Sequence, residues 1–243
     1  MTSTIDILSV PIQNVTIEEA CSYAFQCIDE GKTTAIATAN AEMLMRACHD
    51  DELAHILQQA DLVVPDGAGV LWAAEQQGCH FKERVTGVDL ACKLLEEAAV
   101  RKTSVYLFGG AEGVADMAAA NLQRKYGDVN IVGTHSGFFT AEEEREIIND
   151  IRCKGTQILL VALGVPKQEK WISNHMYELG PCLCMGVGGT LDVLSGKSAR
   201  APKWMQEHRL EWLYRFAKEP TRFKRMLALP KFVIAVKGNK KAK

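Results

Sequence analysis

The sequence lacks the long apolar runs and the metal-ligand patterns that mark several classes of protein. No stretch reaches the ~18 uninterrupted apolar residues that a membrane-spanning helix needs. Residues 1–10 have neither the basic start nor the apolar run of a signal peptide, so we expect a cytoplasmic protein. The histidines show no H-E-x-x-H spacing, and D-x-D, a common carboxylate pair for metal-bound nucleotide diphosphates, is missing. We therefore expect no metal and no cofactor.

Disulfide and zinc patterns are missing as well. Eight cysteines are present, but none forms a C-x-x-C pair, and most fall inside apolar helix or strand patterns. This favours free thiols in a reducing compartment. With 243 residues, of which 47% are hydrophobic, the chain can bury the core of one large α/β domain, with or without an appendage.

Charge is distributed unevenly along the chain. Residues 1–196 hold 14 Lys and Arg against 27 Asp and Glu, a net charge of −13, whereas residues 197–243 hold 14 against 3, a net charge of +11. The split predicts an acidic catalytic domain over 1–196 and a basic appendage over 197–243. The appendage requires an anionic partner, and we expect this to be a membrane surface rather than nucleic acid.

Short β-branched runs alternate with helical patterns over the acidic part. Strands are expected at 5–10, 33–40, 61–67, 104–110, 129–137, 157–164 and 182–189. Helices are expected after Thr16 and Thr140, over 41–60 and 88–102, up to about 125, and from Pro166. This alternation predicts a Rossmann-like, mostly parallel sheet with helices on both faces.

In such sheets ligands bind at the carboxyl ends of the strands, and five of the predicted strands end in polar or glycine residues. These are Thr38 and Asn40; Asp66 and Gly67; Gly109, Gly110 and Gly113; Gly164 to Gln168; and Gly186 to Thr190. They predict one crevice along this edge of the sheet.

The glycine loop at 109–113 lies between a strand and a helix. It suits either a phosphate at the helix N-terminus or a tight turn needed only for packing. A nicotinamide dinucleotide site would also require an acidic residue about 20 residues later, after the next strand. That strand ends in Gly133-Thr134-His135, without an acid, which disfavours an NAD-dependent oxidoreductase.

Asp66 and Arg84 each have two interpretations. Asp66 lies in the sequence Val-Pro-Asp-Gly, which is typical of a turn, but a position beside Thr38 and Asn40 also suits a general base. Arg84 is either a solvated surface charge or a bidentate partner for a diphosphate.

Together these segments resemble the WecG/TagA/CpsF glycosyltransferase family, and the likeness is greatest to its TagA-like branch. The segments are Thr38-Ala-Asn40-Ala-Glu, Pro65-Asp66-Gly67, Arg84-Val-Thr-Gly87, Phe108-Gly109-Gly110, Gly164-Val-Pro-Lys-Gln168-Glu-Lys, Gly186-Val-Gly-Gly-Thr-Leu-Asp192, Gly196 and Arg200-Ala-Pro202. The likeness covers roughly residues 5–235.

The resemblance implies transfer of N-acetylmannosamine, or its uronic acid, from a UDP-sugar donor. The implied acceptor is lipid-linked, N-acetylglucosamine on undecaprenyl diphosphate, and the β-1,4 product feeds teichoic acid or surface polysaccharide. Asp66 would be the base, Thr38 and Asn40 would line the sugar site, and Arg84 and Gln168 would hold the donor. Further substrate-binding candidates are Gly109, Gly110, Gly188, Asp192, Arg215, Arg222 and Arg225. With neither metal nor D-x-D, arginines and backbone N–H groups would stabilise the departing UDP in an inverting reaction.

The appendage has an amphipathic pattern, with Trp212, Phe216 and Phe223 on one face and breaks at Pro220 and Pro230. An ordinary helix packed on the body would show the same apolar spacing. The charge favours peripheral docking on the inner face of a bacterial membrane.

Two other interpretations stay open. A non-catalytic membrane-binding module would account for the tail but not for the polar strand ends. A glycosyltransferase for another sugar, such as N-acetylmannosaminuronic acid, glucose or galactose, would share the whole pattern, because epimers differ by a few hydrogen bonds. The sequence also leaves open whether the chain forms a homo-oligomer.

Overall fold

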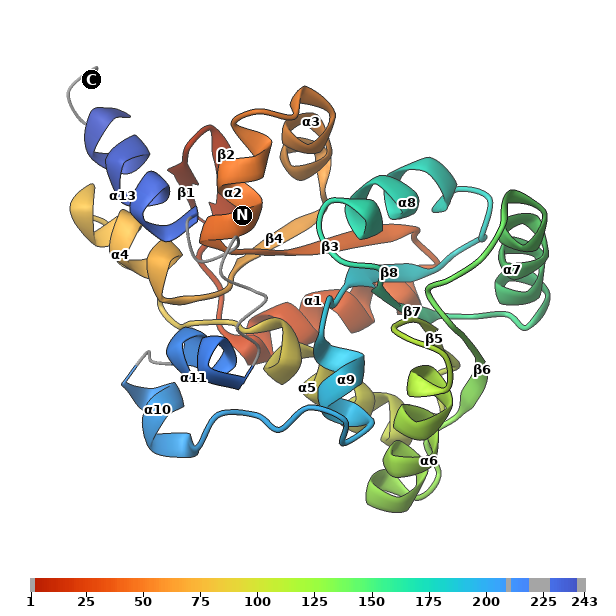
Figure 1. The fold of residues 1–243 in the computed structure, drawn as a ribbon. Helices are drawn as coiled ribbons and strands as arrows, with labels where there is room; N and C mark the ends of the chain where they lie inside the picture. The colour runs from red at the N-terminus through yellow and green to blue at the C-terminus, as the bar shows by residue number, and fades with distance from the viewer. Residues whose placement is uncertain (1–2, 209–210, 219–227, 240–243) are drawn as a thin grey trace.

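The computed structural model describes residues 3–208, 211–218 and 228–239, and its centre is a parallel sheet (Figure 1). The six strands lie in the order β4-β3-β8-β7-β5-β6. They are β3 (Thr34–Ala39), β4 (Leu62–Pro65), β5 (Val105–Gly109), β6 (Ile131–His135), β7 (Ile158–Ala162) and β8 (Leu183–Gly186). Every pairing within this sheet is parallel, so the predicted fold class is confirmed.

Helices cover both faces of the sheet, as predicted. One face carries α1 (Ile17–Asp29), α5 (Gly87–Arg101), α6 (Val114–Tyr126) and α9 (Thr190–Leu194). The other carries α2 (Ala41–Ala47), α3 (Asp51–Gln59), α4 (Ala68–Gln76), α7 (Ala141–Cys153), α8 (Lys167–His175) and α13 (Ala228–Asn239). Alternation along the strands divides the core: Leu107 of β5 faces the first set, whereas Tyr106 and Phe108 face the second.

Local sequence signals set several helix boundaries. The predicted capping box at Thr16 is present, with Thr16 accepting from the Glu19 N–H and Glu19 accepting from the Thr16 N–H. Thr140 and Glu143 form a second box at the start of α7. Four cysteines, Cys21, Cys27, Cys182 and Cys184, are buried thiols. The short helices α4 and α9 were not predicted.

The predicted strand over 5–10 is present only as far as Ile7. The chain instead forms an antiparallel hairpin from β1 (Thr4–Ile7) and β2 (Val10–Gln13). Leu8 and Ser9 make the turn with φ of 51° and 67°. Both central residues of a tight hairpin turn of this kind need positive φ, which usually brings Asn or Gly. Leu-Ser carries no such signal, so the turn could not be seen in the sequence.

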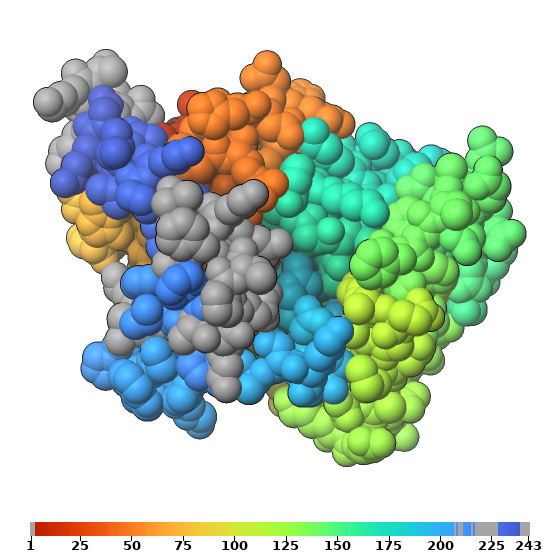
Figure 2. All heavy atoms as spheres, viewed as in Figure 1, coloured from red at the N-terminus to blue at the C-terminus, as the bar shows by residue number. Residues whose placement is uncertain are grey.

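The predicted basic appendage over 197–243 divides into two parts. Near the body, α10 (Lys203–Glu207) and α11 (Glu211–Lys218) follow α9. Helix α13 packs against α2 and α4, and Figure 2 shows it in dark blue beside the orange segment that contains α2. Phe232 and Val236 belong to the same core cluster as Leu44 of α2. This helix is therefore part of the folded body, as the alternative interpretation of the tail would have it.

Helix α8 begins with two buried polar side chains, Gln168 and Glu169, at the carboxyl end of β7. Glu169 lies against β8, where a Cβ atom at Gly186 would stand 3.1 Å from its Oε1 atom. Burial raises the pKa of Glu169 to about 7, even though Gln168 Nε2 donates to Oε1 at 2.7 Å. The close packing that fixes α8 thus carries an electrostatic cost at neutral pH.

Among the described residues, no helix is both long enough and apolar enough to cross a bilayer.

Replacement of Glu169 by Gln should change how stability depends on pH. The folded protein holds this proton between the ordinary pKa of 4.5 and about 7, so wild-type stability falls as pH rises through that window. Gln cannot ionise. Glu169→Gln should therefore gain roughly 2–3 kcal/mol relative to wild type between pH 4 and pH 8, measured by urea unfolding. The exposed Glu112→Gln is the control, and an equal pH slope in wild type and Glu169→Gln would contradict the assignment.

Helix α13 provides a second prediction on stability. Phe232 is 1% exposed and its ring lies 3.7 Å from the Cβ position of Gly69 in α4, so truncation leaves a cavity in the core. Phe232→Ala should cost about 3–5 kcal/mol in the free energy of unfolding. Ile234, on the same helix, is 72% exposed, and Ile234→Ala should stay within about 0.5 kcal/mol of wild type. Equal urea midpoints for the two variants would show that α13 is not packed on the body.

Candidate active site

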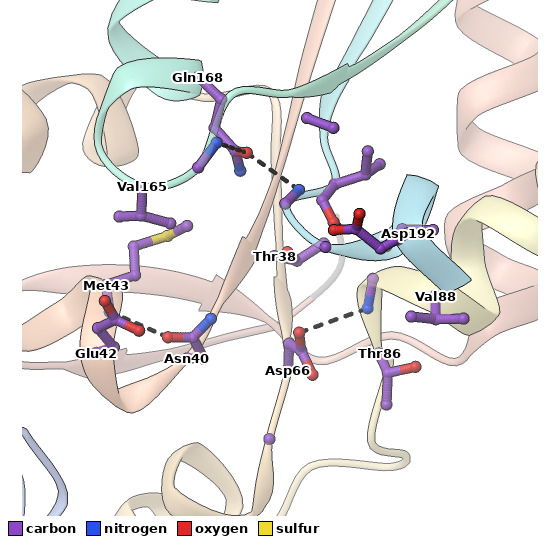
Figure 3. A pocket seen from close by; sticks show the side chains of 18 of the residues that line it. Thr38, Asn40, Glu42, Met43, Asp66, Thr86, Val88, Val165, Gln168 and Asp192 are labelled. Carbon is purple, nitrogen blue, oxygen red and sulfur yellow. Dashed lines mark hydrogen bonds between the residues drawn. The ribbon is translucent and has the colours of Figure 1, made fainter. Parts of the chain in front are cut away.

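A cavity of about 770 Å³ lies at the carboxyl edge of the sheet, where the sequence predicted a crevice. The loops after β3, β4, β7 and β8 line it, together with Gly110 after β5 and Gly137 after β6. Figure 3 shows Thr38, Asn40, Asp66, Gln168 and Asp192 around this space. The strand ends thus bring together residues that are more than 150 positions apart in the chain.

Asp66 lies at the end of β4, and short contacts fix its surroundings. Its N–H donates to the Ala39 carbonyl at 2.8 Å, which holds it beside the end of β3. The Gly87 N–H points to Asp66 Oδ2 at 3.5 Å, a long hydrogen bond (Figure 3). A Cβ atom at Gly87 would stand 3.4 Å from Thr38 Oγ1. The carboxylate, the threonine and the start of α5 therefore form one compact corner of the cavity.

Asn40 lines the cavity but also begins a helix. Its Oδ1 atom accepts from the Met43 N–H at 3.0 Å and so caps α2. With the oxygen held in this way, the amide nitrogen is the group that Asn40 offers to a ligand.

Gln168 reaches the cavity, but its side chain is 2% exposed and serves the protein itself. Oε1 accepts from the Gly164 N–H at 3.1 Å and from the Gly188 N–H at 3.0 Å, while Nε2 donates to Glu169. The side chain therefore ties the loops after β7 and β8 to each other. These hydrogen bonds give Gln168 a positioning role, and the donor contact that the resemblance implies for it stays a prediction.

The glycines of the cavity supply space more than hydrogen-bond donors. A Cβ atom at Gly109 would collide with the Ala162 carbonyl, so β5 and β7 can approach this closely only with glycine. The Gly110 N–H donates to Ala162 at 3.0 Å, and the Gly137 N–H donates to Gly110 at 2.8 Å. With Gly164 and Gly188 held by Gln168, four backbone N–H groups of the cavity already have acceptors. The expectation that such groups would hold a diphosphate is not supported at these positions.

Arg84 belongs to an ion-pair chain that reaches the C-terminal segment. Its Nη2 atom lies 3.1 Å from Glu211 Oε2 of α11. Arg200 lies 3.8 Å from the other oxygen of Glu211, and it pairs with Asp89 through Nη2 and Oδ2 at 2.7 Å. Burial would raise the pKa of Asp89, but hydrogen bonds from Arg200 and Thr86 outweigh it and hold the pKa below its ordinary value. This chain fixes α11 at the mouth of the cavity.

Helix α11 contributes Glu211, Trp212 and Phe216 to the lining, and the start of α13 adds Ala228 and Leu229. Of the three predicted tail arginines, Arg215 lies in α11 but its side chain is outside the described part, and Arg222 and Arg225 lie outside the described residues. Parts of the tail thus line the cavity, whereas the role predicted for the three arginines stays a prediction.

Asp192, in the short helix α9, points into the cavity as the sequence predicted (Figure 3). Glu42, Phe138 and Glu211 also line the cavity and were given no role by the sequence, whereas Lys167 was named only as one of the strand-end residues. Lys167 lies next to Gln168 in one of the segments that resemble the family, and this position could have indicated its place in the cavity. Among the described residues, no group of three or more His, Cys, Asp or Glu side chains is arranged to hold a metal ion.

Comparison with known proteins agrees with this geometry. The chain is 33% identical over 215 residues to the N-acetylglucosaminyldiphosphoundecaprenol N-acetyl-beta-D-mannosaminyltransferase of Bacillus spizizenii, covering 88% of this chain and 83% of that protein. It is 31% identical over 216 residues to the protein of the same name from Bacillus subtilis, covering 89% and 84%. The profile of the glycosyl transferase WecG/TagA/CpsF family matches residues 5–243. With nearly the whole sequence matched, the chain belongs to the WecG/TagA/CpsF family of glycosyltransferases.

Proposed function

We propose that this chain transfers N-acetylmannosamine from UDP-N-acetylmannosamine to N-acetylglucosaminyl-diphospho-undecaprenol. The product is a β-1,4-linked disaccharide on the lipid carrier, used in wall teichoic acid or surface polysaccharide assembly. The observation that carries the proposal is Asp66, which stands with Thr38 and Asn40 in a cavity at the strand ends. The names of the two Bacillus relatives, which match most of the chain, supply the sugar and the acceptor.

Asp66 is the base in this proposal. A base must lie within hydrogen-bond reach of the proton that it removes. From the end of β4, Asp66 faces the cavity in which an acceptor hydroxyl would lie. As the C4 hydroxyl oxygen bonds to the anomeric carbon, its proton passes to Asp66. The bond from that carbon to the β-phosphate oxygen breaks, with inversion at the anomeric centre.

Departing UDP must be stabilised as negative charge grows on its β-phosphate. Because four nearby backbone N–H groups already have acceptors, cationic side chains have to supply much of this stabilisation. Arg84 lines the cavity and can pair bidentately with a phosphate group. Its present partner is Glu211, so a bound phosphate would exchange with, or add to, that ion pair.

Asp192 completes the proposed site. Carboxylates accept hydrogen bonds from the hydroxyls of sugars and of ribose. Asp192 enters the cavity from α9, across from the α2 side that carries Asn40 (Figure 3). The site thus offers an acceptor and an amide donor on different walls, which suits a polar sugar nucleotide.

Docking on an anionic membrane surface is the second part of the proposal. The lipid-linked acceptor has to be met at the bilayer. In the segment whose net charge is strongly positive, Trp204 is 57% exposed, and Leu213, in the helix α11 that contributes to the cavity lining, is 41% exposed. Exposed apolar side chains among basic residues are typical of a peripheral membrane contact. Attachment would lie on the cytoplasmic face, where the acceptor and the soluble donor meet.

Replacement of Asp66 by Asn tests the catalytic proposal. The amide keeps the size of the side chain but removes the base, so kcat should fall by about 10²–10⁴-fold. The assay is UDP release from a panel of UDP-sugars with lipid-linked N-acetylglucosamine as acceptor. UDP-N-acetylmannosamine should be the preferred donor.

The matched control is Asp61→Asn, at the opposite end of β4, where the carboxylate only accepts from the Ala35 N–H. It should keep kcat within about twofold of wild type. Wild-type turnover in Asp66→Asn would reduce Asp66 to a turn residue. Preference for the uronic acid, glucose or galactose donor would redirect the proposal to another polymer.

Membrane docking is tested by point substitution rather than truncation, because removal of the whole tail also deletes the buried Phe232. Trp204→Ser with Leu213→Ser should lower co-sedimentation with phosphatidylglycerol vesicles at least tenfold at low salt. Activity on a water-soluble acceptor should be unchanged. High salt should release the wild-type protein as well, because screening weakens the basic contribution.

The control carries Val100→Ser and Tyr177→Ser, which remove exposed apolar side chains elsewhere on the surface. It should sediment like wild type. A wild-type protein that stays in the supernatant at low salt would refute docking through this segment.

A further inference from the structure

Lys167 is a cation of the cavity to which the family likeness gives no role. Among the described lining residues the cations are Arg84 and Lys167. Arg84 is paired with Glu211, whereas Lys167 takes part in none of the ion pairs found in the described part of the chain. Lys167 lines the cavity and is exposed at the N-terminus of α8.

An aromatic ring gives this ammonium group a defined position. Lys167 Nζ lies 4.5 Å from the centroid of Phe139, within the range of a cation–π interaction. Phe139 in turn packs on the buried Phe108 of β5, with ring centroids 5.3 Å apart. The lysine is thus directed toward the loop that follows β6.

That loop forms the floor of the cavity on the β5–β6–β7 side. Gly137 sits so close to Gly110 that a Cβ atom there would stand 3.1 Å from the Gly110 carbonyl oxygen. The glycines leave room for a bulky group, but the N–H groups of Gly110 and Gly137 already donate within the protein. A phosphate on this side needs positive charge from a side chain, and Lys167 is placed to supply it.

We infer that Lys167 binds the diphosphate of the nucleotide-sugar donor on the β5–β6–β7 side of the cavity. This inference rests on the proposed function. The two cations stand toward opposite edges of the sheet. The Arg84 loop is bonded to β4 through the Val85 N–H and the Pro65 carbonyl, whereas Phe139 follows β6. Arg84 lies on the side of α11, to which it is joined through Glu211. Lys167 therefore supplies positive charge to the donor on the side of the cavity away from Arg84, which keeps the role proposed above.

In the reaction, Lys167 would act on the leaving group. As the bond from the anomeric carbon to the β-phosphate oxygen breaks, its electron pair stays on that oxygen. A positive charge placed beforehand beside the phosphates stabilises the new charge more than it stabilises the bound donor. Lys167 therefore contributes both to binding of the product UDP and to turnover.

Titration of UDP and UMP into full-length protein tests the inference. Lys167→Met removes the charge and keeps most of the aliphatic length, and UDP should bind at least tenfold more weakly. The loss should be smaller for UMP, which lacks the β-phosphate. Lys167→Arg should restore much of the affinity, and kcat for the UDP-sugar should follow the same order.

Lys170→Met is the matched control on the same helix. Lys170 pairs with Asp50 and Glu52, outside the cavity, so its loss should change UDP affinity by less than about twofold. Unchanged UDP affinity in Lys167→Met would overturn the inference while leaving the proposed function standing. So would a raised KM for the lipid acceptor with normal UDP binding. Failure of wild-type protein to bind UDP would overturn the donor assignment and the inference together.

Discussion

One side-chain amide holds the centre of the site together. Oε1 of Gln168 accepts from the N–H groups of Gly164 and Gly188, and so joins the ends of β7 and β8. Parallel strands bring their carboxyl ends to one edge, but the loops beyond them have no ladder to fix them. The buried Gln168 amide accepts a hydrogen bond from each of two loops, and so takes the place of the backbone hydrogen bonds that join neighbouring strands. Its own nitrogen donates to Glu169, whose burial raises the pKa of that carboxyl group. The shape of the cavity depends on this arrangement.

The hydrogen bonds within the cavity loops also limit which groups can stabilise the negative charge of a substrate. A backbone N–H group that already donates to an oxygen of the protein is not free for a substrate, and this holds at Gly110, Gly137, Gly164 and Gly188. Glycine at these places allows close approach of strands, which is a steric role. In the proposed reaction, stabilisation of the leaving diphosphate is therefore assigned to cationic side chains. The loops pack closely at these four glycines, and their N–H groups do not form the anion-binding site that a glycine-rich loop usually provides.

Periodicity and capping signals were sufficient to predict the sheet, its helices on both faces and the edge that carries the site. The remaining features depend on tertiary contacts that no local pattern contains. The hairpin turn at Leu8 and Ser9 requires positive φ without the residues that usually signal it. The role of Gln168 could not be read from its motif, because its partners Gly164 and Gly188 are brought together by folding. Its position after a strand predicted that Gln168 lies at the cavity, but not which groups its side chain bonds to.

The basic tail shows how a correct observation can support too broad a conclusion. Net charge describes a whole segment, whereas packing is decided by single faces of helices. Phe232 and Val236 lie four positions apart, on one helical face, and that face is buried despite the lysines around it. The tail is also joined to the body by charge pairs, since Arg200 pairs with Asp89 of the body and Glu211 pairs with Arg84 of the body. In the proposed docking, the anionic surface would therefore contact the segment between these two anchors. That segment includes α11, which stands at the mouth of the cavity.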